Sequence, residues 1–185
     1  MRCIIGAVVL CAFLIPGALG TAAFAGDPVS DKPLNEHLEP LRPFLGKTWR
    51  GEFANSTPER PVIDVSRWER ALNGNAIRIL HSINKGEYGG ETIVFYDNAK
   101  ETLAYYYFTT AGFYTTGTFT IDGNALTGHE YVTGSTEGVT EVKSTGTIRP
   151  DGTMHSKAQY LKNGEWVDGH EVTYVEAPEA EVVFR

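Results

Sequence analysis

The residue best placed to do chemistry is His81, which lies in a run of aliphatic residues. Ile77, Ile79 and Ile83 alternate with it, so on a strand all four side chains would leave the same face. We expect this face to point inward. An imidazole among aliphatic side chains needs a hydrogen bond, because burying it unpaired costs about 1 to 3 kcal/mol. His81 is therefore either a satisfied core histidine or a group that orients a ligand.

A second candidate is the pair Asp168 and His170, which stand two residues apart. On a regular strand both would leave the same face, where a carboxylate can orient an imidazole. No serine lies in a Gly-x-Ser-x-Gly elbow, and zinc would need a further ligand from another strand, such as His129 or His155. The pair fits either acid and base chemistry or a solvated polar edge, so we assign no catalytic residue and no metal ligand.

Aromatic residues gather between positions 88 and 114. Tyr105 and Tyr107 share one side of a strand, and Tyr106 and Phe108 share the other, so only one pair can line an interior. The alternation leaves open which pair that is. A tyrosine combines apolar area with a hydroxyl that can orient a ligand. Our candidate ligand-binding residues are Trp68, His81, Tyr105, Tyr107 and Tyr160.

The elements that must position these residues are short β-rich runs separated by turn dipeptides. The dipeptides are Asn73-Gly74, Gly89-Gly90, Asp97-Asn98, Asp122-Gly123, Asp151-Gly152 and Asn163-Gly164. The runs are Thr48 to Ala54, Val62 to Leu72, Ala76 to Lys85, Glu91 to Tyr96, Glu101 to Thr110, Phe113 to Ile121, Ala125 to Thr133, Val139 to Arg149, Thr153 to Lys162 and Glu165 to Val175.

Ten strands joined by short loops predict an all-β fold. No segment among them is long enough for a crossover helix, so neighbouring strands should pair antiparallel and close into an up-and-down barrel. Small residues recur on the inward side of two late strands, at Ser144, Gly146, Ser156 and Ala158. Opposite large residues they would leave an unfilled volume, unless bulky neighbours fill it.

One short amphipathic helix is expected before the barrel. Leu34, Leu38 and Leu41 recur at three or four residues, although Pro40 and Pro43 limit the regularity of the helix. Its simplest role is to plug one end of the barrel. We expect Trp49 to be buried at that closed end.

The amino terminus has the pattern of a signal peptide. Arg2 precedes an apolar run from Cys3 to Ile15, and small residues up to Ala25 follow. The run is too short to span a bilayer permanently. A lipid on Cys11 is the alternative, but Leu10 stands where a small residue is expected. We therefore divide the chain into a signal peptide (1–25), a leader with the capping helix (26–46), the barrel (47–177) and a tail (178–185), and expect a periplasmic or secreted protein.

Composition limits the partners. Both cysteines lie in the segment that would be removed, so the mature chain has no disulfide. The 16 basic and 23 acidic residues are spread along the chain without a basic block. Nucleic acid and an anionic membrane are therefore unexpected partners, since phosphate binding needs a basic face. We also expect no stable membrane insertion. The oligomeric state stays open.

Two stretches carry a resemblance. Leu41 to Phe53, with Gly46 three residues before Trp49, is similar to the opening of calycin-type barrels. Trp68, the glycine pairs and the aromatic strand resemble a family of small bacterial lipocalin-like proteins and, more distantly, nitrobindin. Likeness to nitrobindin would imply haem held by a histidine close to the carboxyl end. Here the last histidine is His170, followed by Glu171 to Arg185, which departs from that pattern.

Four interpretations of function remain. We expect a binder or carrier of a small, largely apolar molecule, with no required cofactor. The first alternative is an enzyme using His81, or Asp168 with His170, in the same cavity, and the second alternative is a nitrobindin-like haem protein. A scaffold that contacts proteins through an outer aromatic face would be the third.

Overall fold

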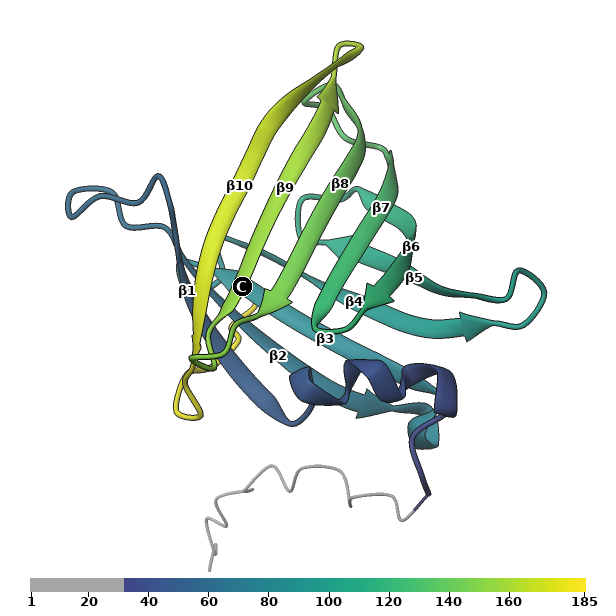
Figure 1. Ribbon diagram of the computed structural model, residues 1–185. Helices are drawn as coiled ribbons and strands as arrows, with labels where there is room; N and C mark the ends of the chain where they lie inside the picture. Colours follow the sequence, from purple (N-terminus) through teal and green to yellow (C-terminus); the bar gives the residue numbers. More distant parts are fainter. Residues whose placement is uncertain (1–31) are drawn as a thin grey trace, which may run out of the picture.

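Ten strands pair antiparallel in chain order, and the first closes the sheet against the last (Figure 1). The structure is a computed structural model that describes residues 32–185; the expected signal peptide lies outside this range. The strands are β1 (Lys47–Phe53), β2 (Ile63–Ala71), β3 (Ala76–Ile83), β4 (Tyr88–Asp97), β5 (Thr102–Thr109), β6 (Tyr114–Asp122), β7 (Ala125–Thr133), β8 (Val139–Ile148), β9 (Met154–Lys162) and β10 (Glu165–Glu176). The predicted closed barrel of ten strands is confirmed.

The predicted turn at Gly89-Gly90 is wrong. Both glycines lie inside β4, paired with Ser82 and His81 of β3, and the actual turn uses the left-handed residues from Asn84 to Gly86. The two glycines are needed for close approach instead. A Cβ on Gly90 would overlap the inward ring of Tyr107, and one on Gly89 would crowd the backbone of His81. A strand glycine can thus mark a contact, not a turn.

The predicted helix forms as a 3-10 helix, η1 (Glu36–Phe44), with Pro40 and Pro43 inside it. Prolines remove the backbone donors that a regular α-helix would need. Its buried residues Leu38, Leu41 and Phe44 recur every third position, which matches the period of a 3-10 helix. A second, three-residue 3-10 turn, η2 (Leu72–Gly74), joins β2 to β3.

The apolar core lies where η1 covers one end of the barrel (Figure 1). Trp49 is fully buried there, as predicted, and its indole Nε1 donates to the Phe44 carbonyl at 3.5 Å. Phe44 stacks on Trp68 with ring centroids 4.9 Å apart. The helix therefore closes this end through aromatic and leucine contacts.

Inside the barrel, large rings lie against strand glycines. Gly51 faces Tyr174, Gly117 faces Tyr105, and Gly128 faces Phe119, each close enough that a Cβ would collide with the ring or force it to move. In each pair the glycine lies directly across from the aromatic residue on the neighbouring strand. This pairing lets the rings lie flat along the wall, and the middle of the barrel stays open.

The chain continues past β10 across the outer surface. The Val183 backbone N–H donates to the Ser82 hydroxyl at 3.0 Å, and Phe184 packs beside Gly89. Ser82 is buried beneath this tail. In the part of the chain from residue 32 onward, no helix has the length and apolarity to cross a membrane.

Candidate functional site

The barrel encloses a cavity of about 570 Å³. Its closed end is formed by Phe44, Trp68 and neighbouring apolar side chains, and residues 134–137 of the β7–β8 loop line it at the other end. Ser144, Gly146 and Ser156 form part of the wall. The expected unfilled volume is therefore present, because these small side chains do not reach the large ones opposite.

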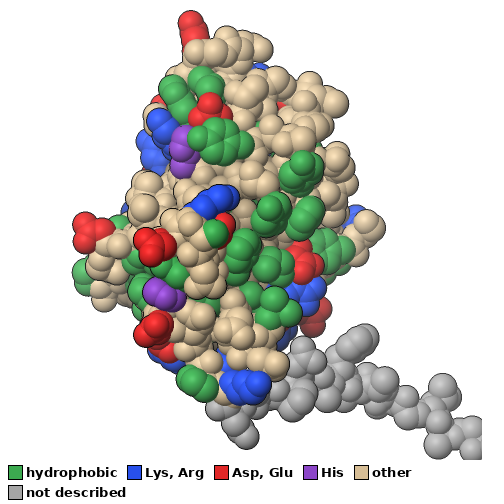
Figure 2. Space-filling view, turned by 90° about the vertical axis from the view of Figure 1, so that its right-hand side faces the viewer, with side chains coloured by type: hydrophobic (Ala, Val, Ile, Leu, Met, Phe, Trp, Pro, Cys, Tyr) green, Lys and Arg blue, Asp and Glu red, His purple; other side chains and the backbone are tan. Residues whose placement is uncertain are grey.

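All five candidate ligand-binding residues lie on this wall: Trp68, His81, Tyr105, Tyr107 and Tyr160. Whether they contact a ligand stays a prediction. The structure decides the orientation of the aromatic strand, because Tyr105 and Tyr107 line the cavity while Tyr106 and Phe108 are 45% and 52% exposed. Hydrophobic side chains gather on the outer face over this part of the barrel (Figure 2).

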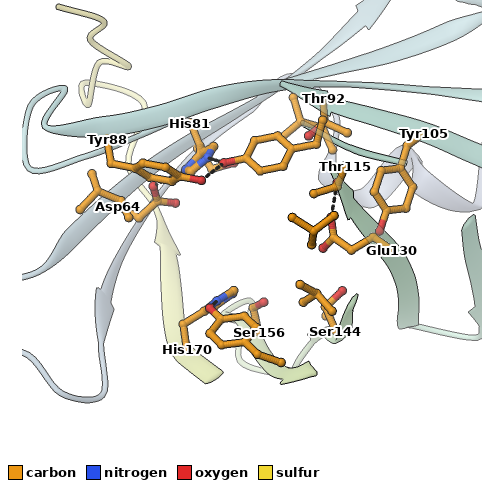
Figure 3. Close-up of a pocket in the computed structure, with 18 of the residues that line it drawn as sticks. Asp64, His81, Tyr88, Thr92, Tyr105, Thr115, Glu130, Ser144, Ser156 and His170 are labelled. Carbon is orange, nitrogen blue, oxygen red and sulfur yellow. Dashed lines mark hydrogen bonds and ion pairs between the residues drawn. The ribbon is translucent and has the colours of Figure 1, made fainter. Parts of the chain in front are cut away.

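A chain of hydrogen bonds crosses one wall of the cavity (Figure 3). His81 Nδ1 lies 2.9 Å from Asp64 Oδ1, and His81 Nε2 lies 2.8 Å from the Tyr107 hydroxyl. The Tyr107 hydroxyl lies 2.8 Å from that of Tyr88. The other Asp64 oxygen accepts a hydrogen bond from the Tyr174 hydroxyl at 2.8 Å. His81 is thus a cavity-lining histidine whose two ring nitrogens both have protein partners.

The direction of these bonds follows from Asp64, which as a carboxylate can only accept. His81 then donates from Nδ1, and in the neutral imidazole Nε2 accepts from the Tyr107 hydroxyl. Burial raises the pKa of Tyr107, so this hydroxyl stays protonated. An imidazole oriented by a carboxylate suits a general base. Here, however, the second ring nitrogen, Nε2, bonds to the Tyr107 hydroxyl and not to a serine or cysteine nucleophile.

The expected common face of Asp168 and His170 is wrong. Asp168 pairs with Gln159 of β9 and Glu171 pairs with Lys157, so β10 has one extra residue between these positions. Such a bulge reverses the side-chain alternation. His170 therefore lines the cavity while Asp168 is exposed outside, and the two cannot act together. The bulge falls at Gly169, which packs against the Tyr160 ring.

His170 has its own partner inside. Its Nδ1 lies 2.6 Å from the Tyr160 hydroxyl, and its ring lies 5.8 Å from that of Phe53. Burial lowers the pKa of His170, which favours the neutral imidazole. Sequence alternation placed this histidine on the same face as Asp168, and the bulge separates the two side chains.

Glu130 was missed by the sequence reasoning. It lines the cavity from β7 and accepts a hydrogen bond from the Thr115 hydroxyl of β6. Burial raises the pKa of Glu130, an effect that the Thr115 hydrogen bond partly offsets. A signal was available, because Glu130 alternates with Leu126, Gly128 and Val132 on what is the inward side of its strand.

The other histidines do not reach the cavity. His129 pairs with Glu141 at 2.7 Å, and His155 pairs with Glu171 at 2.8 Å, both outside the cavity lining. Neither can therefore join His170 in a zinc site. Within residues 32–185 no three histidine, cysteine, aspartate or glutamate side chains come together in a way that could hold a metal ion.

A haem group, which a nitrobindin-like protein would hold, would need a histidine that faces the cavity. His170 fits this role, because its imidazole is inward and held at Nδ1 by Tyr160, which leaves Nε2 for a metal. Haem would supply iron chemistry at that position. The chain itself would orient the imidazole through Tyr160 and exclude water with the surrounding aromatic side chains.

Fold and cavity together define a closed, ten-stranded antiparallel barrel of the calycin-like type with an internal pocket. Among solved structures, the chain is similar to the crystal structure of Rv2717c from M. tuberculosis, with a TM-score of 0.59 and 15% sequence identity. The likeness covers 78% of this chain and 99% of that one. At this identity it shows a shared fold. No family model matches the sequence, and no curated protein matches it.

Proposed function

We propose that the protein binds or carries a small, largely apolar molecule inside the barrel. The observation that carries this proposal is the cavity of about 570 Å³, which falls within the range of about 300 to 1,000 Å³ common for ligand pockets. Aromatic and aliphatic side chains form a little over half of its wall, and polar side chains line most of the rest, some of them held in place by hydrogen bonds. That combination buries a ligand through its apolar surface and orients it through hydrogen bonds.

The polar groups favour binding over catalysis. Both ring nitrogens of His81 bond to protein groups, and Asp168 lies on the opposite face from His170. No described residue pairs with either cavity histidine as a serine or cysteine nucleophile would. The cavity therefore has oriented hydrogen-bonding groups without an assembled catalytic set.

Binding can be tested with a neutral fluorescent probe, N-phenyl-1-naphthylamine, and a variant that narrows the cavity. Gly146 lines the wall, and a Cβ there meets only ordinary contacts with Leu126. Gly146→Val should weaken probe binding and leave the fold intact. Thr127→Val, which adds apolar surface on the exposed side of β7, is the matched control and should bind normally. Equal binding by Gly146→Val would show that the probe does not enter the cavity.

The proposed location is outside the cytoplasm, on the strength of the amino-terminal pattern from Arg2 to Ala25. Expression of the full chain followed by amino-terminal sequencing of the exported form should give a start near Gly26. An acylated Cys11 would show lipoprotein processing instead, and an intact Met1 would contradict export.

Haem binding is a second candidate, favoured by the inward, neutral His170. Titration of the purified protein with hemin should give an absorbance band of a histidine-ligated haem that disappears in His170→Ala. His155→Ala, on the outer surface, is the control. A band that His170→Ala leaves unchanged would remove this candidate.

A further inference from the structure

The ionisable side chains in the cavity wall are mainly acidic. Three acidic residues line it, namely Asp64, Glu130 and Glu137, and none of the described residues in its wall is a lysine or an arginine. Apart from hydroxyls, the other ionisable side chains in the wall are the imidazoles of His81 and His170, and burial favours the neutral form of His170. The described wall therefore has three acidic side chains and no lysine or arginine to neutralise them.

The three carboxylates differ in how many of their oxygen atoms have hydrogen-bond partners in the protein. Asp64 is 3% exposed and has a partner on each oxygen, His81 on one and Tyr174 on the other. Glu130 has one such partner, the Thr115 hydroxyl on Oε2. Its other oxygen has no hydrogen bond from a described residue and faces the cavity. Glu137 lies in the exposed β7–β8 loop at the mouth.

A neighbouring hydroxyl also points to this position. Tyr105, Gly117 and Glu130 lie in one row across β5, β6 and β7. Because Gly117 has no side chain, the Tyr105 hydroxyl passes over it toward Glu130 (Figure 3). This hydroxyl has no hydrogen bond to another described residue. Glu130 and Tyr105 thus offer a ligand one carboxylate oxygen and one hydroxyl on the same wall.

From this geometry we infer that the ligand is an apolar amine, with its ammonium group on the Glu130 carboxylate and the Tyr105 hydroxyl and its apolar part toward Trp68 and Phe44. A charge-assisted hydrogen bond to a carboxylate in an enclosed site is stronger than a neutral one. A fatty acid would bring its carboxylate to a wall in which no described residue is a lysine or an arginine. The inference rests on the proposed function and names the class of ligand for the same cavity.

The raised pKa of Glu130 adds a second expected signature. Where burial keeps Glu130 protonated in the empty protein, pairing with an ammonium group ionises it and releases a proton. The other cavity groups that share this environment are Asp64, His81, His170, Glu137 and the tyrosine hydroxyls. Proton release that depends on Glu130 therefore has to be separated from theirs by substitution.

The test compares decylamine, decanol and decanoate, which share an apolar tail and differ in the head group. Calorimetric titration of the mature protein should give the order decylamine, then decanol, then decanoate, with about ten- to a hundredfold between amine and alcohol. Titrations between pH 5 and 8 in buffers of different ionisation enthalpy should show proton release with the amine alone.

Glu130→Gln keeps the shape and the Thr115 contact but removes the charge. It should reduce the amine preference over the alcohol to less than about threefold and abolish proton release. Glu165→Gln makes the same chemical change at an exposed position of β10, outside the cavity, and should behave as wild type. Thermal melting of each variant confirms that it is folded.

The outcomes separate the two proposals. Equal binding of the three compounds, or tighter binding of decanoate, would overturn the amine assignment and leave the carrier function standing. An amine preference that survives in Glu130→Gln would overturn the role of Glu130. Failure of all three compounds and of N-phenyl-1-naphthylamine to bind would overturn the proposed function itself.

Discussion

Replacing His81 with leucine should destabilise the barrel more than it weakens ligand binding. The substitution removes the bond from Nδ1 to the Asp64 carboxylate and the bond from Nε2 to the Tyr107 hydroxyl. A bond to a charged group contributes about 1.5 to 3 kcal/mol and a neutral one about 0.5 to 1.5 kcal/mol. The expected loss is about 2 to 4 kcal/mol, because Asp64 retains only Tyr174.

The assay is a double-mutant cycle with Asp64→Asn, measured by chemical denaturation. Asparagine keeps the size of Asp64 but removes the charge that His81 pairs with. The double variant should therefore lose less stability than the two single losses together, by about 1 to 3 kcal/mol. His155→Leu breaks an outer pair with Glu171 and should change the free energy of unfolding by less than about 1 kcal/mol.

Two results would refute this reasoning. Additive effects of His81→Leu and Asp64→Asn, within about 0.5 kcal/mol, would show that the pair is not coupled. A loss of N-phenyl-1-naphthylamine affinity above about tenfold in His81→Leu, with stability nearly unchanged, would show that His81 orients the ligand and is not held by the protein.

Three further predictions concern stability and use the same denaturation measurements. Burial raises the pKa of Glu130 in the folded protein above its value in the unfolded chain, so ionisation of Glu130 opposes folding. Glu130→Gln should therefore gain stability relative to wild type as pH rises from 4 to 7 and lose that advantage at pH 4 and below. A constant difference across this range would contradict the assigned burial. Gly117→Ala should lower the free energy of unfolding by about 1 to 3 kcal/mol because the added Cβ collides with Tyr105, whereas Gly146→Ala should be neutral or slightly stabilising. Equal effects of the two substitutions would mean that the contacts between glycines and rings do not shape the wall. Trp49→Ala should cost about 3 to 5 kcal/mol, and a change within about 0.5 kcal/mol would place this side chain outside the core.

The sequence predicted turns correctly where the residues strongly prefer one backbone conformation. Asn73-Gly74, Asp151-Gly152 and Asn163-Gly164 form turns with left-handed residues, as expected. Gly89-Gly90 was also predicted as a turn dipeptide but lies within a strand. The difference arises because Gly90 is required by the Tyr107 ring, which comes from a strand that lies beside it only in the folded barrel.

The amino-acid sequence by itself determined the number of strands, their order of pairing and the inward position of His81. Period-two alternation and turn chemistry are local properties, and short loops leave antiparallel neighbours as the natural arrangement. Tertiary structure decided the chemistry of the cavity. The bulge in β10 separated Asp168 from His170, and pairing of β6 with β7 brought Thr115 to Glu130. One extra residue moves every later side chain on a strand to the opposite face, and the local sequence pattern does not show where such a residue lies. The hydrogen-bond partners of a buried carboxyl group come from other strands, so the local pattern does not show them either.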